Sequence, residues 1–277
     1  MRIGIVGLGL IGGSIARALK ANTAHTVIGF DRDENTLLDA LSLGAIDSVG
    51  STSLLENADV VYVCLYPADV VRFVEENAPH FKEGCIVTDV CGIKNQVCGK
   101  LTEIAKNYPF VYVGGHPMAG REFSGFRYAK DDLFDRASMI LTPPRDAGPE
   151  VRTWLKDFFL TIGFRRVQFT TPREHDEMIA YTSQLAHVVS SAYVKCPLAQ
   201  KHRGFSAGSF ADMTRVAKLN EDMWTELFFD NRDALLPEIN GLIDRLAAYR
   251  DALAAEDHQA MKQLLREGRE IKEALEE

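Results

Sequence analysis

A histidine lies among glycines and turn-forming residues in the stretch GGHPMAG, residues 114–120. Gly114 and Gly115 allow a close approach of the backbone, and Pro117 stiffens the segment on the far side of the histidine. The pKa of an imidazole lies near neutral pH, so His116 held against a ligand can accept a proton during a reaction. The alternative is a loop histidine with no chemical role.

A glycine pattern near the start of the chain can bind a ligand. Its sequence is Gly7-x-Gly9-x-x-Gly12, and it follows an apolar run and begins a helical pattern. In this context it is typical of a dinucleotide-binding turn. Gly7 permits the tight turn, Gly9 lets a pyrophosphate approach the backbone, and Gly12 allows close packing of strand and helix. The helix N-terminus then faces the phosphates. The alternative is a turn without a ligand.

An acidic residue, Asp31, ends the second apolar run, where it can accept hydrogen bonds from an adenosine ribose. A carboxylate there repels a 2′-phosphate, so we expect NAD rather than NADP, although the neighbouring Arg32 could soften that preference. A surface acid without a ligand is the alternative for Asp31. The residues expected to bind the cofactor are Gly7, Gly9, Leu10, Ile11, Gly12, Asp31, Arg32, Leu65, Pro67 and Asp89.

Short β-branched runs alternate with helical patterns through the first part of the chain. The predicted strands are Ile3–Val6, Thr26–Phe30, Val60–Cys64, Cys85–Val90, Phe110–Val113, Met139–Leu141 and Arg166–Phe169, and helices between them include Ser14–Lys20, Glu34–Leu43 and Ala68–Glu76. This alternation predicts an α/β fold with an N-terminal Rossmann-type, doubly wound and mostly parallel sheet. His116 is expected just past the carboxyl end of a strand, the edge at which such sheets bind ligands.

The character of the sequence changes after this region, and almost everything that follows is helical. Thr171 is predicted to cap a helix that has Pro172 at its first position. One long helix is expected over Arg173–Lys195, and two or more over Met223–Leu275. We therefore predict a dinucleotide-binding domain over residues 1–170 and an all-α domain over residues 171–277.

The last segment of the chain, Gln259–Glu277, is highly charged, with its apolar residues on one face. That pattern is typical of a helix docked on a partner surface such as another subunit, and equally of a solvated terminal helix.

The composition limits the class of protein and its partners. The chain has 277 residues and a formal net charge of -8, which argues against general binding to nucleic acid or to an anionic membrane. No apolar run approaches the ~18 residues needed to cross a bilayer, and the glycine-rich N-terminus is expected to be mature structure. The five cysteines form no C-x-x-C pair, which indicates a cytoplasmic protein. No Cys or His spacing predicts a metal site.

Five segments together resemble one enzyme family. GLGLIGGS at 7–14, TDVCGIK at 88–94, GGHPMAG at 114–120, SQLAH at 183–187 and FADMTRVAK at 210–218 are similar, in this order, to prephenate dehydrogenases, some of which act on arogenate. The resemblance covers nearly the whole chain. It implies oxidation of prephenate or arogenate by NAD(P) with loss of carbon dioxide, in tyrosine biosynthesis, by a homodimer whose helical domains form the interface. With no further domain expected after the helices, any inhibition by tyrosine is expected at the active site.

The resemblance also assigns roles to single residues. It implies that His116 is the catalytic base, that Arg215 binds a substrate carboxylate, that His187 lines the substrate pocket and that Glu122 guards its mouth. The chain departs from the family at Gly92, where many members have a serine that helps to orient the catalytic histidine. The source of that support is therefore left open.

The chemistry of arginine and histidine agrees with the roles given to Arg215 and His187, and an alternative remains for each. A substrate with two carboxylates requires fixed cations, and an arginine binds a carboxylate through two parallel hydrogen bonds. The alternative for Arg215 is a surface salt bridge with Asp212. His187 shares a helix face with Gln184 and Ser191, a polar stripe expected to meet substrate, and we assign Gln184 to the substrate site as well. The alternative is a hydrogen-bonded core histidine.

Two other classes of protein compete with this interpretation. A β-hydroxyacid dehydrogenase has a catalytic lysine on a glycine-rich helix, and neither Lys195, Lys201 nor Lys218 lies in such a context. An NAD-responsive regulatory module would bind the cofactor without turnover. The choice between prephenate and arogenate, which differ in one keto or amino group, stays open.

Overall fold

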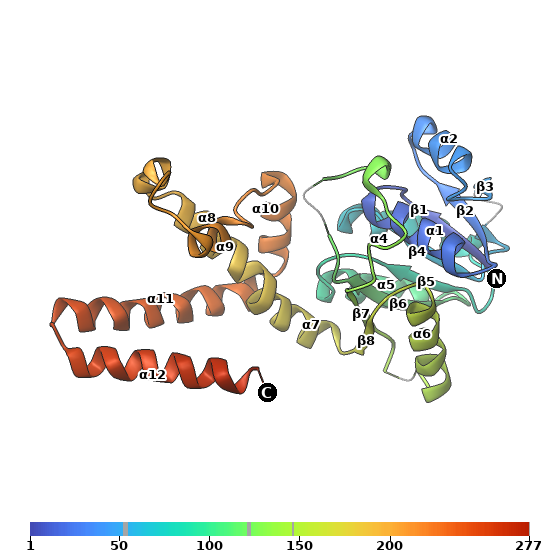
Figure 1. Cartoon of the computed structure of the whole chain (residues 1–277). Coiled ribbons are helices and arrows are strands. Elements are labelled where there is room, and N and C mark those ends of the chain that lie inside the picture. The colour runs from blue at the N-terminus through green and yellow to red at the C-terminus, as the bar shows by residue number, and fades with distance from the viewer. Residues whose placement is uncertain (52–54, 121–122, 146, 277) are drawn as a thin grey trace. The chain divides into compact units, whose positions relative to one another are not determined.

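A computed structural model of the chain describes residues 1–51, 55–120, 123–145 and 147–276. The chain forms two compact units, Met1–Asp176 and Glu177–Glu277. The first contains all the strands of the described chain, and the second is helical (Figure 1).

An eight-stranded sheet forms the centre of the first unit, in the order β3-β2-β1-β4-β5-β6-β7-β8. The strands are β1 (Arg2–Val6), β2 (Thr26–Phe30), β3 (Ser48–Val49), β4 (Val60–Val63), β5 (Ile86–Asp89), β6 (Val111–Pro117), β7 (Ser138–Thr142) and β8 (Arg166–Phe169). All neighbours pair in parallel except β6 and β7. The strand order reverses between β1 and β4, the point at which open α/β sheets bind ligands. The predicted mostly parallel, doubly wound sheet is confirmed.

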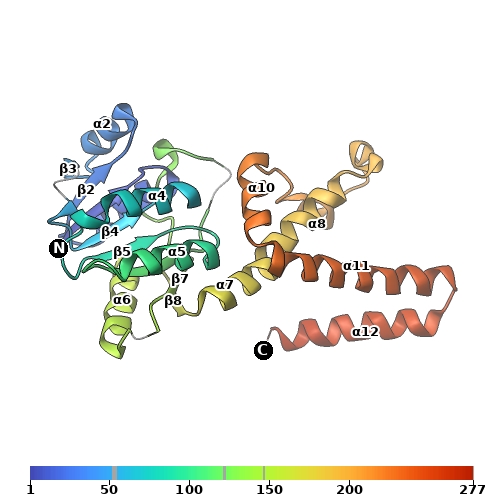
Figure 2. The ribbon, with the colours of Figure 1, turned by 180° about the vertical axis from the view of Figure 1, so that it is seen from behind.

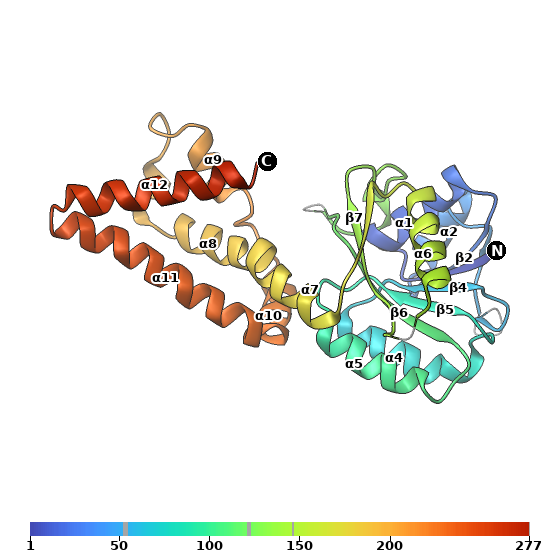
Figure 3. The same cartoon turned by 90° about the horizontal axis from the view of Figure 1, so that it is seen from below.

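Helices cover both faces of this sheet. They are α1 (Leu10–Asn22), α2 (Glu34–Ser42), α4 (Pro67–Asn77), α5 (Asn95–Ala105) and α6 (Pro149–Thr161), with short 3₁₀ turns at Ala78–His80 and Phe126–Tyr128. Figure 3 shows α4 and α5 on one face and α1 and α6 on the other.

Alternating strand residues build a separate core on each face of the sheet. Ile3 and Ile5 of β1 pack in the cluster that contains the apolar residues of α1, α2 and α6. Val61 and Val63 of β4 pack in the other, against α4 and α5. Because residues on both faces are buried, the strands of a parallel sheet are almost continuously apolar, which is the signal that made them predictable.

The strand that carries His116 is longer than the sequence predicts. β6 pairs in parallel with β5 only over Val111–Val113, and its continuation through Pro117 pairs with antiparallel β7. His116 lies opposite Ile140 in that ladder, so the expectation of a loop histidine is wrong. It does lie past the end of the parallel part of the sheet, because β5 ends before it.

A capping box begins α7 (Pro172–Ile179). The Thr171 hydroxyl accepts from the amide of Glu174 at 3.2 Å, and the Glu174 carboxylate accepts from the Thr171 amide at 3.1 Å. The predicted cap at Thr171 is thus formed. The compact first unit extends to Asp176 rather than to the predicted boundary near residue 170, because the first turn of α7 bonds to residues of the sheet unit.

The second unit contains a helical hairpin, α11 (Arg232–Ala254) and α12 (His258–Ala274), whose helices contact each other and run antiparallel (Figure 2). The other helices are α8 (Leu185–Val194), α9 (Gly208–Thr214), α10 (Glu221–Asp230) and a 3₁₀ segment, Pro197–Lys201. The predicted helix Arg173–Lys195 is interrupted by a π-helical segment, Ala180–Gln184. The buried apolar core of the second unit is small and centres on Ala180, Leu185 and Leu235.

Among the described residues, no helix combines the length and the apolar character that a transmembrane span requires.

Candidate active site

The glycine-rich turn joins β1 to α1 and has the shape that a dinucleotide requires. Gly7 adopts a positive φ of 86°, a conformation that side chains disfavour, and its amide donates to the carbonyl of Phe30 at 2.7 Å. A Cβ on Gly12 would overlap the carbonyl oxygen of Gly7, so this glycine lets α1 begin directly against the turn. Apart from the adjoining residues of the chain, no described atom lies within 4 Å of a Cβ placed on Gly9. The turn is therefore open on the side from which a ligand approaches the backbone.

Asp31 lies beside this turn at the end of β2. One of its carboxylate oxygens accepts from the amide of Leu8 at 2.7 Å, and the other accepts from the amide of Asp33 at 3.0 Å. Arg32 is exposed. The carboxylate is held at the rim of the turn, at the position expected for a ribose contact.

The remaining turn and strand-end residues assigned to the cofactor lie at the same edge of the sheet. Leu10 and Ile11 form the first turn of α1. Leu65 follows β4, close to Gly7, and Pro67 begins α4. These side chains are therefore gathered at the strand-order reversal between β1 and β4.

His116 is fixed in β6 because the residues before it are glycines. A Cβ on Gly115 would lie 2.5 Å from the carbonyl oxygen of Asp89 and 2.6 Å from Cε of Met139. The His116 ring is partly buried. Loss of solvent around the ring lowers the pKa of His116 well below its ordinary value, and the neighbouring His175 and the positive charge of Lys94 act in the same direction. The imidazole is therefore neutral at pH 7 and can accept a proton.

Asp89 has an environment different from the one expected of a cofactor ligand. It is fully buried, and its carboxylate accepts from Cys91 N at 2.8 Å, Tyr112 OH at 2.6 Å and Gly115 N at 3.3 Å. It also forms an ion pair with the ammonium group of Lys94, which is equally buried. Burial acts to lower the pKa of Lys94, but the negative charge of Asp89 and the other neighbours raise it overall. These contacts favour a supporting role for Asp89 behind the His116 strand.

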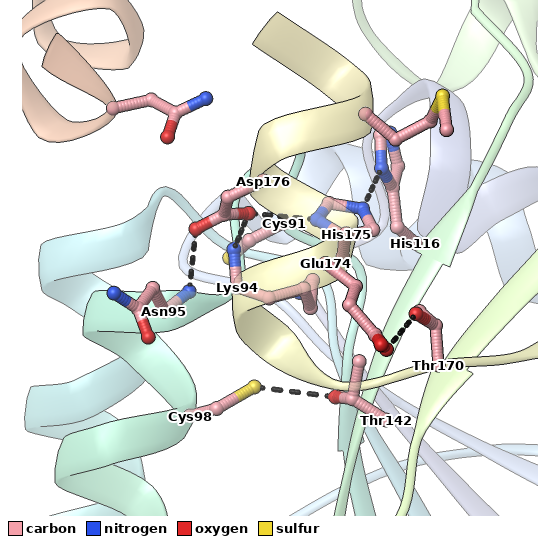
Figure 4. A network of polar contacts seen from close by, with 12 residues as sticks. Cys91, Lys94, Asn95, Cys98, His116, Thr142, Thr170, Glu174, His175 and Asp176 are labelled. Carbon is pink, nitrogen blue, oxygen red and sulfur yellow. Dashed lines mark hydrogen bonds and ion pairs between the residues drawn. The ribbon is translucent and has the colours of Figure 1, made fainter. Parts of the chain in front are cut away.

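A chain of three titratable side chains runs from His116 to α7 (Figure 4). Nδ1 of His116 lies 2.8 Å from Nε2 of His175, and Nδ1 of His175 lies 2.7 Å from Oδ1 of Asp176. His175 is 2% exposed and Asp176 is 5% exposed. Sequence reasoning missed both residues. The available signal was a His-Asp pair one turn into a capped helix that follows the last strand of the sheet.

Asp176 also binds the start of α5. Its two carboxylate oxygens accept from the amides of Lys94 at 2.8 Å and Asn95 at 2.7 Å. A carboxylate is favoured at a helix N-terminus, where backbone amides lack partners. Gly92 has no hydroxyl to offer His116, and the side-chain partner that the structure shows for His116 is the imidazole of His175.

In the second unit, His187 and Arg215 are electrostatically coupled. Nδ1 of His187 donates to the carbonyl of Val216 at 3.0 Å, and its ring lies 4.0 Å from that of Trp224, centroid to centroid. Burial lowers the pKa of His187, the bond to Val216 opposes that shift, and the charge of Arg215 adds to it. Within the described part of the chain Arg215 is exposed and forms no ion pair, so the alternative salt bridge with Asp212 is absent there.

The other two residues assigned to substrate have different outcomes. The Gln184 amide donates to the carbonyl of Leu227 at 2.9 Å and accepts from Asn231 at 2.7 Å. With the side chain buried and both polar atoms bonded within the protein, a structural role is favoured over substrate contact. Glu122 lies outside the described residues.

A dinucleotide-binding turn on a doubly wound sheet, with a neutral imidazole at the sheet edge, defines a nicotinamide-dependent oxidoreductase. Two family models match the chain: "Prephenate dehydrogenase, nucleotide-binding domain" over residues 15–168, and "Prephenate dehydrogenase, dimerization domain" over residues 171–267. The chain belongs to the prephenate dehydrogenase family.

Known relatives span nearly the whole chain. A cyclohexadienyl dehydrogenase of Zymomonas mobilis is 31% identical, covering 99% of this chain and 95% of the relative. The structure of Synechocystis arogenate dehydrogenase is 27% identical, with a TM-score of 0.86 and coverage of 99% of this chain and 100% of that one. That of A. aeolicus prephenate dehydrogenase, in complex with hydroxyphenyl propionate and NAD+, is 27% identical, with a TM-score of 0.83 and coverage of 99% and 98%.

Proposed function

We propose that this protein oxidises and decarboxylates prephenate to 4-hydroxyphenylpyruvate with NAD. The observation that carries the proposal is His116, a neutral imidazole held rigidly at the edge of a sheet whose first turn fits a dinucleotide. Membership of the prephenate dehydrogenase family supports the substrate.

The residues present fit the cofactor. The open backbone at Gly9 and the N-terminus of α1 suit a pyrophosphate, and Asp31 suits a ribose with a free 2′-hydroxyl. A 2′-phosphate would be repelled by that carboxylate, so NADP is disfavoured. When bound, NAD supplies the hydride acceptor for the carbinol carbon of the substrate ring.

The residues of the chain have three tasks in this reaction. His116 removes the proton of the ring hydroxyl as the carbon–oxygen double bond forms. The bond to the ring carboxylate then breaks, its electrons make the ring aromatic, carbon dioxide leaves, and the phenolate oxygen regains a proton. Arg215 binds a carboxylate of the substrate, and His187 lines the substrate pocket. Aromatisation supplies the driving force, so the protein has to position the substrate and accept one proton.

Arogenate is the second candidate substrate, because the solved relative named arogenate dehydrogenase is as similar in sequence as the one named prephenate dehydrogenase. Prephenate is preferred. The two candidates are compared directly in the experiment below.

We further propose a cytoplasmic homodimer formed through the helical unit. The family model for this unit is a dimerization domain, and α11 and α12 expose large apolar side chains, namely Ile243, Leu246, Leu253, Leu265 and Ile271. All five cysteines are free, which is compatible with a reducing compartment. Light scattering after gel filtration tests the dimer, and a monomer at micromolar concentration would contradict it.

The function is tested by the initial rate of NAD reduction, followed by absorbance, with prephenate and arogenate in parallel and His116→Asn as the control. Prephenate turnover that the substitution abolishes is the expected result. Faster turnover of arogenate would reassign the substrate. Absence of turnover with either compound, with NAD still bound, would contradict the proposal.

A further inference from the structure

We propose that His175 and Asp176 are positioning residues that select the tautomer of His116, so that its Nε2 atom is unprotonated and faces the substrate hydroxyl. This inference rests on the proposed function, in which His116 is the base. It adds two residues to that function, and it states which nitrogen of His116 accepts the proton.

The hydrogen positions follow from the Asp176 end of the chain of contacts. Its carboxylate accepts from the amides of Lys94 and Asn95, as an ionised group does. A carboxylate cannot donate, so the 2.7 Å contact with His175 requires the proton to lie on Nδ1 of His175. Nε2 of neutral His175 is then a bare acceptor.

The position of the proton on His116 follows from that on His175. Its Nδ1 lies 2.8 Å from Nε2 of His175, which accepts, so Nδ1 of His116 carries the proton. Nε2 of His116 is left with a free lone pair. An imidazole in this tautomer is a base at Nε2, whereas the opposite tautomer would present a hydrogen there and could not accept the substrate proton.

The alternative is a doubly protonated His175 that donates to both neighbours. It would form an ion pair with the Asp176 carboxylate, while the charge of the Lys94 ammonium group is already balanced by Asp89. It would also force His116 into the inactive tautomer. The neutral form of His175 is the one that leaves Nε2 of His116 free to accept a proton, and the NMR experiment below distinguishes the two forms.

The arrangement also supports the protonated state that follows. Once Nε2 of His116 has taken the substrate proton, the ring is a cation that still donates through Nδ1 to His175. The Asp176 carboxylate stabilises that cation through the intervening ring, without itself becoming protonated. The contact with His175 and Asp176 thus sets both the orientation of the His116 ring and its strength as a base.

The two positioning residues are themselves held in place. The capping box of Thr171 and Glu174 sets the first turn of α7, and Asp176 is tied to the first turn of α5. Two helices therefore determine where the His175 ring lies, and a ring so restrained can hold a partner imidazole in one orientation.

The direct test is nitrogen NMR of protein labelled with 15N-histidine, in which two-bond couplings distinguish the tautomers. His116→Asn identifies the His116 signals. The expected result is a proton on Nδ1 of His116 in the unsubstituted protein. A proton on Nε2 at pH 7 would overturn the proposal whether or not the protein turns over substrate.

The functional test is Asp176→Asn, which removes the negative charge beside His175 and puts a donating amide group in place of one of the two accepting oxygens. We expect the His116 proton to move to Nε2 and kcat to fall about 10²-fold or more, with Kd for NAD within about twofold. Asp257→Asn is the matched control, because Asp257 caps α12 through the amides of Gln259 at 3.0 Å and Ala260 at 2.9 Å. It should reduce stability and leave kcat unchanged.

A second pair of variants separates positioning from packing. His175→Leu removes the acceptor and should lower kcat about 10²-fold, whereas His175→Gln restores an acceptor oxygen and should recover at least about tenfold of that loss. Equal losses in the two variants, in proportion to their loss of thermal stability, would mean a packing role and would overturn the proposal. So would Asp176→Asn with an unchanged tautomer and a kcat within about threefold of the unsubstituted enzyme.

Failure of the proposed function gives a different result. If the unsubstituted protein turns over neither prephenate nor arogenate, the reaction assignment fails, while the NMR experiment still decides the tautomer. If turnover is present and the variants behave as packing mutants, the reaction stands and the positioning role fails.

Discussion

His116 and His187 are both imidazoles whose pKa is lowered by burial, one in each unit, but their hydrogen-bond partners differ in kind. His116 bonds to a second ring that ends on a carboxylate, and His187 bonds to a backbone carbonyl. A carbonyl fixes a ring in place, and a ring tied to a carboxylate also stabilises the charge that arrives when a proton is taken up. Burial alone therefore does not distinguish the two imidazoles, and we expect the partner of the second ring nitrogen to decide which of them is the base.

Among the variants that test the difference between His116 and His187, His116→Asn should have the largest effect. An asparagine fits the site but cannot accept a proton, so kcat should fall by about 10²–10⁴-fold, the usual contribution of a general base. The measurement is the rate of NAD reduction with saturating prephenate. Binding of NAD, measured by titration, should be unchanged. A loss smaller than about tenfold would mean that another group is the base.

Arg215→Ala should raise KM for prephenate by about 10–100-fold, because a charge-assisted hydrogen bond to a carboxylate contributes about 1.5–3 kcal/mol. The same substitution should raise the pKa of His187, since the charge of Arg215 lowers it. Steady-state kinetics and an NMR titration of His187 measure the two effects. Lys218→Ala, three residues away, is the control and should change neither. An unchanged KM would remove Arg215 from the substrate site.

Acidic pH should inactivate the enzyme by protonating His116. The folded-state pKa of His116 lies well below its ordinary value of about 6.5. We therefore expect kcat to stay constant as the pH falls through 6.5, and to fall about tenfold per pH unit below the folded-state pKa. The charged or titratable neighbours are His175, Lys94 and Asp176. An acid limb of kcat centred above pH 6.5 would contradict this assignment.

The same shift predicts a change in stability. Below about pH 6.5 the unfolded His116 binds a proton and the folded one does not, so folding stability falls as pH drops from there toward the folded pKa. Urea denaturation of the unsubstituted protein and of His116→Asn over that range measures the difference, which should shrink with the substitution.

The smallest effect is expected from His187→Asn. Loss of the bond to Val216 and of the ring contact with Trp224 should raise KM for prephenate about 3–10-fold and change kcat by less than about threefold. Steady-state kinetics check this, with His258→Asn, an exposed histidine at the start of α12, as the control. A kcat loss as large as that of His116→Asn would remove the distinction between the two imidazoles.

Much of the first unit was predictable from local signals. The Gly7-x-Gly9-x-x-Gly12 turn and the apolar strands follow from steric demands within a few residues of chain, as does the Thr171 cap. The His116–His175 contact joins positions 59 residues apart, and no local pattern specifies it. The burial of Asp89 was not predictable for a similar reason, since it depends on Lys94 and Tyr112, which meet Asp89 only in the folded sheet.

The π-helical segment was also not predictable. Its sequence is compatible with an ordinary helix, and the contacts of Gln184 with Leu227 and Asn231 come from distant parts of the second unit.

The antiparallel ladder of β6 and β7 limits how this protein can change over time. Successive strand residues point to opposite faces, so a single insertion or deletion between Gly114 and His116 would turn the imidazole to the other side of the sheet. A histidine on a loop could be displaced by one residue in the sequence and still contact the substrate. We therefore expect homologues to vary in sequence around GGHP while keeping its length, and loop-grafting designs that alter that length to be inactive although folded.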